Sequence, residues 1–67
     1  MTNIFGENLK RIREEEGISQ DELARRIHIC RESVSKWETG KASPQLKWVY
    51  EIAVALNVNP TELVRTK

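Results

Sequence analysis

The sequence has little of several features on which particular protein classes depend. It contains one cysteine among 67 residues, so no internal disulfide and no four-cysteine metal site can form. Small secreted domains usually rely on such crosslinks, and their absence favours a reducing compartment, which we expect to be the cytoplasm. The opening segment MTNIFGENLKRIREEE lacks the apolar core of a signal peptide, and no stretch approaches the length of a membrane span.

An excess of charge of one sign is also lacking. Eleven Lys and Arg residues against ten Asp and Glu residues leave a net charge of +1. This near-neutrality disfavours a histone-like protein that binds DNA by charge alone. A chain of 67 residues has room for one hydrophobic core, so we expect a single domain over residues 1–67.

Glycine and proline are few, and they divide the chain into short amphipathic segments. Within the first segment, Phe5, Leu9 and Ile12 recur at the spacing of one helical face. The run 52–58 could alternate as a strand, but alanine is a weak strand former and the residues before it favour a helix. We therefore predict an all-α fold of five helices, over residues 3–16, 20–27, 31–38, 44–56 and 60–65.

Capping residues set the expected helix boundaries. Ser19–Glu22 fits the S-x-x-E capping box, which predicts a helix start at residue 20. Ser43–Pro44 and Asn59–Pro60 each combine an N-cap residue with a proline suited to the first helical position. Gly17 and Asn57 suit the left-handed positions that end helices. The expected inner residues of the middle three helices are Leu23, Ala24 and Ile27, then Val34 and Trp37, then Leu46, Val49, Ala53 and Leu56. The short last helix is expected to carry Leu63.

The segment from Gln20 to Trp37 has the pattern of a helix-turn-helix. Two short helices are joined by a tight connection at residues 28–30. Two helices that cross at a steep angle need a small side chain at the crossing, and Ala24 provides one. The small, apolar and polar positions coincide over eighteen residues, which makes the signal fairly specific.

Three segments, LKRIREEEGISQDELARRI, SVSKWETGKASP and ALNVNPTEL, occur in an order and at spacings that resemble the lambda-repressor/Cro-like, or Xre-type, helix-turn-helix regulators. The resemblance runs from about Phe5 to Val64. It implies a compact five-helix domain, lambda-repressor-like, whose third helix enters the DNA major groove. It also implies a pairing of Arg13 with Glu38 that links the first helix to the end of the third, and dimerisation through the last helices.

Two positions depart from the family pattern. His28 stands where glycine is usual, because the backbone of the turn is left-handed there. Cys30 replaces the usual Ser or Thr at the N-cap of the third helix. His28 and Cys30 lie two residues apart, but two possible ligands with no others nearby cannot close a zinc site, so we expect no metal.

The outer face of the third helix follows from its period. Val34 and Trp37 define its buried direction at 100° per residue, which leaves three polar residues and a neighbouring arginine on the opposite side. Their groups match base edges: Arg donates twice to guanine, Glu accepts from cytosine, Lys reaches guanine or phosphate, and Ser takes either role. We predict as base-reading residues Arg31, Glu32, Ser35 and Lys36, although these could also be an ordinary solvated face.

A second set of residues is expected to hold the phosphate backbone. Gln20 stands at a helix N-terminus, where the helix dipole favours an anion. Ser33 and Lys41 are the other candidates, and the resemblance implies the same positions. Such contacts set the register on DNA and carry no sequence information.

Apolar residues near the C-terminus are left over from the predicted core. A dimer surface is expected from Val54, Val58, Pro60 and Leu63. The expected function is a sequence-specific DNA-binding repressor that acts as a homodimer on a roughly palindromic operator. The alternative is an antitoxin-type or other interaction module that binds a partner protein through Trp48, Tyr50 and Val54. No residue set supports an enzyme, and no cofactor is expected.

Overall fold

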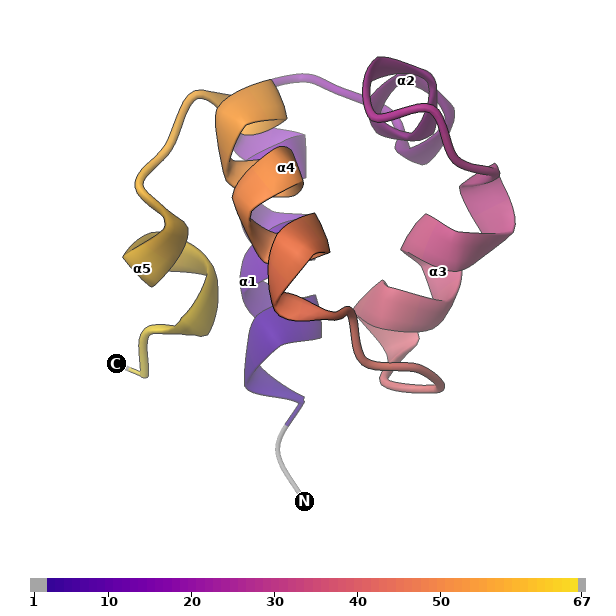
Figure 1. The fold of residues 1–67 in the computed structure, drawn as a ribbon. Helices are drawn as coiled ribbons and strands as arrows, with labels where there is room; N and C mark the ends of the chain where they lie inside the picture. Colours follow the sequence, from indigo (N-terminus) through magenta and orange to yellow (C-terminus); the bar gives the residue numbers. More distant parts are fainter. Residues whose placement is uncertain (1–2, 67) are drawn as a thin grey trace.

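The computed structural model of the protein describes residues 3–66. Over that range the chain forms five α-helices and no strand, so the expected all-α fold is confirmed (Figure 1). The helices are α1 (Ile4–Glu15), α2 (Gln20–Arg26), α3 (Arg31–Thr39), α4 (Leu46–Leu56) and α5 (Pro60–Val64). No helix of the described residues is long and apolar enough to cross a membrane.

The capping residues act at four of the expected boundaries. The Ser19 hydroxyl accepts a hydrogen bond from the backbone N–H of Glu22 at 3.0 Å and starts α2. Asn59 caps α5 in the same manner. Gly17 and Asn57 adopt left-handed backbone angles, with φ of 71° and 58°. Four helices therefore begin and end within one residue of the sequence-based expectation.

The start of α4 differs from the expectation. Ser43–Pro44 does not open the helix: α4 begins at Leu46, and Gln45 is its N-cap residue. The carbonyl of Gln45 accepts the first helical hydrogen bonds, while its side chain makes no capping bond. Because a proline fits just before a helix as well as in its first turn, the sequence alone did not separate the two positions.

The core lies where all five helices meet, and Figure 1 shows α3 and α5 on either side of α1 with α4 crossing in front. α1 packs against α3 and α5, α2 packs against α3 and α4, and α4 packs against α5. The fully buried large side chains are Leu9, Leu23, Val34, Ile52, Leu56 and Leu63.

Three residues of α4 lie differently from the expectation. Leu46 was expected on the inner face but is 67% exposed, because it is the first residue of the helix and lies beyond the packed part. Ile52, which completes the buried stripe with Val49, was missed. Trp48 was expected toward solvent but is half-buried, with its ring centroid 6.1 Å from that of Trp37.

Candidate nucleic-acid interface

A tight turn with one left-handed residue joins α2 to α3. His28 holds that position with φ of 62°, so the turn forms with histidine where glycine would be unstrained. The backbone N–H of Ile29 donates to the carbonyl of Ala24 at 3.0 Å and closes the turn. Ala24 is itself buried at the contact between the two helices, as its size predicts. The chain therefore adopts a helix-turn-helix.

The N-terminus of α3 is held without an oxygen cap. Cys30 is its N-cap residue and makes no side-chain capping bond. The Cys30 Sγ lies 3.4 Å from the Ser33 Oγ, and this hydrogen bond lowers the pKa of the exposed Cys30 thiol from its ordinary value of 9.0. Ser33, a predicted phosphate ligand, is half-buried and its hydroxyl faces the thiol.

A buried ion pair fixes the other end of α3. Arg13 Nε donates to Glu38 Oε2 at 2.7 Å, and Arg13 Nη2 donates to Glu38 Oε1 at 3.1 Å. A third donor of the guanidinium reaches the carbonyl of Ile18 at 2.8 Å. Hydrogen bonding to the carboxylate raises the pKa of Arg13 against the opposing effect of burial. The pairing that the family resemblance implied is thus a two-pronged contact that ties α1 to the last turn of α3.

The amide of Gln20 joins the same cluster. Gln20 Nε2 donates to Glu38 Oε1 at 2.9 Å, so the side chain reaches from the start of α2 into the ion pair. It is half-buried rather than extended into solvent. The predicted contact of Gln20 with phosphate would therefore use the second N–H of its amide or the backbone N–H groups at the α2 N-terminus.

The predicted base-reading residues lie together on the open side of α3. They line one shallow depression with Lys41 and one further residue; the lining is Arg31, Glu32, Ser35, Lys36, Thr39 and Lys41. The three cations and Glu32 are exposed, and Ser35 is half-buried. Residues from the first turn of α3 to the loop that follows it therefore share one accessible surface, which we call the α3 face.

Thr39 was missed at this surface. It follows Ser35 by four residues and Lys36 by three, which are the spacings of one helical face. Its hydroxyl donates to the carbonyl of Ser35 at 3.0 Å. The expected helix end at residue 38 excluded it, although the period of the other face residues points to it.

The cations of the α3 face, like Lys10 and Lys47 elsewhere, lack the carboxylate partners that the other arginines have within the described residues. Carboxylates lie within 4 Å of five arginines elsewhere, namely Arg11, Arg13, Arg25, Arg26 and Arg65. Within residues 3–66, Arg31, Lys36 and Lys41 have no such partner. A cation without an internal partner keeps its donors and its charge available for an external anion.

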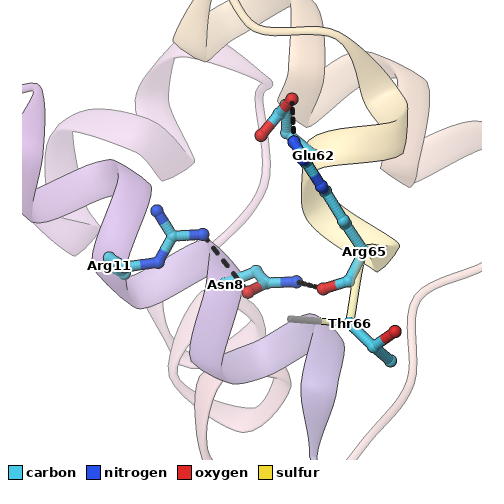
Figure 2. A pocket seen from close by; sticks show the side chains of 5 residues that line it. All are labelled: Asn8, Arg11, Glu62, Arg65 and Thr66. Atoms are coloured by element: carbon cyan, nitrogen blue, oxygen red, sulfur yellow. Dashed lines mark hydrogen bonds and ion pairs between the residues drawn. The ribbon is translucent and has the colours of Figure 1, made fainter.

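The hollow between α1 and α5 shows the opposite arrangement (Figure 2). Asn8 Nδ2 donates to the carbonyls of Leu63 and Arg65 at 3.0 and 2.9 Å, which ties the C-terminal segment to α1. Arg11 donates to Asn8 Oδ1 at 3.3 Å, and Arg65 pairs with Glu62 at 3.1 Å. The side chains of Asn8, Arg11, Glu62 and Arg65 are therefore already engaged in hydrogen bonds and ion pairs within the hollow.

Three of the four predicted dimer residues are less accessible than expected. Leu63 is 0% exposed and belongs to the core, so its assignment to a surface was wrong. The period that placed it in α5 also points it inward, where α1 and α4 cover it. Val58 is half-buried against the core, and Pro60 is half-buried. Val54 is 80% exposed.

A metal centre finds no support in the part of the chain that the structure describes. Across residues 3–66, no group of three or more His, Cys, Asp or Glu side chains could hold a metal ion.

Comparisons with known proteins agree with this geometry. The helix-turn-helix family model matches residues 9–63. The HTH-type transcriptional regulator y4dJ of Sinorhizobium fredii is 36% identical over 64 residues, which are 96% of this chain and 83% of that protein. The prophage-derived HTH-type transcriptional regulator YonR of Bacillus subtilis is 37% identical over 92% of this chain, which spans 57% of YonR.

A solved structure shares the same fold. The restriction-modification controller protein C.AhdI of Aeromonas hydrophila superposes with a TM-score of 0.85 and 34% identity. The match covers 88% of this chain and 89% of that one. The five-helix arrangement is therefore that of an established group of helix-turn-helix proteins.

Proposed function

The chain belongs to the helix-turn-helix family of DNA-binding transcriptional regulators, and we propose that it is a cytoplasmic repressor that binds a roughly palindromic operator as a homodimer. The observation that carries the proposal is the α3 face, where Arg31, Lys36 and Lys41 are exposed and have no carboxylate partner within residues 3–66. Cations without a carboxylate partner among the described residues lie beside polar side chains on α3 and the loop that follows it. This arrangement suits the major groove of DNA, which admits an α-helix.

Specificity is assigned to four residues of that face. Arg31 donates in a fork to guanine O6 and N7, and Glu32 accepts from cytosine N4. Ser35 and Lys36 read the neighbouring positions, and Lys41 binds phosphate. An acidic residue repels the DNA backbone, so Glu32 favours discrimination between bases over total affinity.

An apolar stripe on α4 supports the homodimer. Leu46, Tyr50 and Val54 are exposed and follow one another at intervals of four residues, on one helical face. A shallow hollow joins this stripe to α5, where Pro60 and the exposed Val64 contribute. A second copy docked on this α4 stripe would carry a second α3, and the two helices would read half-sites about 34 Å apart.

Selection of bound sequences from random DNA tests the proposal. We expect a site with two-fold symmetry, bound in the nanomolar range and at least a thousandfold more tightly than random DNA. The selected site is then placed over a promoter, and transcription by purified polymerase should fall as the protein is added. Weak binding that is equal on all sequences would contradict the proposal, and increased transcription would make the protein an activator.

A charged residue introduced on the α4 stripe tests whether this surface forms the dimer. Val54→Glu should leave folding unchanged, since the side chain is 80% exposed, and should weaken self-association and binding to the full site. Binding to a single half-site should be unaffected. Glu51→Gln, an exposed change on the same helix, is the control.

A second candidate function rests on the same exposed residues. Tyr50 and Val54 would contact a partner protein, as in an antitoxin, whereas Trp48 is half-buried and packs against the core. A chain that stays monomeric on its selected DNA, with binding unchanged by Val54→Glu, favours this function over the dimer.

A further inference from the structure

One side chain joins the start of α1 to the end of α3. Asn3 is the N-cap residue of α1, and its Oδ1 accepts from the backbone N–H of Gly6 at 3.2 Å. Its Nδ2 donates to the carbonyl of Glu38 at 3.0 Å and lies 3.4 Å from the carbonyl of Trp37. The last carbonyls of a helix lack partners within the helix, so the amide satisfies the end of α3 while it caps the start of α1.

Two glycines make room for this amide. A Cβ at Gly6 would overlap both the carbonyl oxygen of Trp37 and the Asn3 side chain. A Cβ at Gly40, the left-handed C-cap of α3, would lie 3.1 Å from Asn3 Nδ2. At Gly6 only hydrogen fits beside the Asn3 amide, whereas at Gly40 a Cβ would crowd the amide and the left-handed backbone already favours glycine.

The end of α3 is the part of the helix that this contact controls. The carbonyl of Lys36 accepts from the backbone N–H groups of Lys41 and Ala42, so the last turn of α3 also sets the start of the loop. Lys36 and Lys41 line the α3 face. The Arg13–Glu38 pair holds this turn through side chains, and Asn3 holds its backbone.

We propose that Asn3, seated between Gly6 and Gly40, is a positioning residue that fixes the angle and last turn of α3 for DNA reading. The inference rests on the proposed function, and it assigns a role to Asn3 and Gly6, which precede the 9–63 segment matched by the family model. The two atoms of the amide have separate functions. The oxygen caps α1, and the nitrogen donates to the end of α3.

Replacement of the Asn3 amide nitrogen, with the capping oxygen retained, separates these two functions. Asn3→Asp keeps the acceptor for Gly6, and aspartate is as good an N-cap as asparagine. It loses the donor to Glu38 and places negative charge beside the carbonyl end of α3, where the helix dipole opposes it. Asn3→Ser also keeps a capping oxygen and loses the amide N–H that donates to the carbonyl of Glu38, without added charge. Asn59→Asp is the matched control, because Asn59 caps α5 through Oδ1 alone.

Two measurements are made on each variant. Amide hydrogen exchange of the free protein reports the last turn of α3, and we expect Gly40 and Lys41 to exchange about fivefold faster in Asn3→Asp and Asn3→Ser relative to the core amide of Ile52. Competition between the selected site and random DNA reports base discrimination, and we expect it to fall about fivefold or more in both Asn3 variants. Asn59→Asp should change neither ratio.

The outcomes are distinct. Equal acceleration of all amides, or equal loss of affinity for selected and random DNA, would reduce Asn3 to a general stabilising residue and overturn the proposal. In another outcome, the unsubstituted protein shows no preference among DNA sequences while the Asn3 variants still exchange faster only at the end of α3. That result would contradict the proposed repressor function and would leave the contact of Asn3 with α3 established. Identical behaviour of Asn3→Asp and Asn59→Asp would also overturn the proposal.

Discussion

Glu38 is a buried carboxylate whose environment is built from three helices. It accepts two hydrogen bonds from Arg13 and one from Gln20, so its charge is both paired and hydrogen-bonded. Removal of one member of such a pair is more damaging than the absence of the whole pair, because the remaining charge stays buried without a partner. The exposed pair of Arg65 with Glu62 has no comparable constraint.

Glu38→Gln is therefore expected to lower the free energy of unfolding by about 3–5 kcal/mol, measured by urea denaturation. The matched change Glu62→Gln should cost less than about 1 kcal/mol. The double variant Arg13→Met/Glu38→Leu should recover much of the loss, since no charge is left unpaired. Equal effects at positions 38 and 62 would contradict a special role for the buried pair.

Arg31 differs from every other arginine in the described residues because no carboxylate lies within 4 Å of its guanidinium. If it reads a guanine, Arg31→Ala should lose about 1–3 kcal/mol of discrimination at one base pair and leave the preference at other positions intact. Titration against single-base variants of the selected site measures this. Arg25→Ala, which removes an exposed, paired arginine of α2, should leave every base preference unchanged.

At the level of elements, α4, like α3, begins without a side-chain capping bond. Its N-cap Gln45 has the extended backbone angles of a capping residue, φ −70° and ψ 160°, but makes no side-chain capping bond. Serine has the short hydroxyl that reaches the free N–H groups of the first turn. Gln45→Ser should therefore raise the free energy of unfolding by about 1 kcal/mol, measured as a higher Tm. Gln45→Ala should not raise it, and a gain there would point to a cause other than capping.

The sequence predicts the elements well where a local rule decides the outcome. Ser19 and Asn59 cap their helices and Asn57 ends one, because each effect depends on a few neighbouring backbone groups. The start of α4 was placed two residues early because Pro44 satisfies the local rule equally well outside the helix.

The rest depends on contacts between distant segments, which no local rule describes. Trp48 turns inward because Trp37 of another helix provides a surface for it. The contact of Asn3 with Glu38 spans 35 positions and has no motif. The four base-reading candidates of the α3 face followed from the helical period, whereas Thr39 lay beyond the expected helix end and Lys41 lies in the loop after α3, which the period does not describe.

The whole molecule carries a net charge of +1. Its ion pairs determine which of its cations remain available to contact the phosphates of DNA. Most arginines are neutralised locally, whereas Arg31, Lys36 and Lys41 are free on one face. Affinity for DNA falls with salt in proportion to the number of phosphates that are neutralised. A nearly neutral molecule with few free cations should thus bind random DNA weakly and show a shallow salt dependence.

Lys41→Ala tests this distribution of charge. If Lys41 binds phosphate, the slope of log K against log salt concentration should become shallower by about 0.9 for each protomer bound. Base preference should stay the same, because phosphate contacts carry no sequence information. Titrations of the selected site at four salt concentrations measure both quantities. Lys10→Ala, an exposed lysine of α1 that does not line the α3 face, should leave the slope unchanged. A changed base preference in Lys41→Ala would instead place this lysine at a base edge.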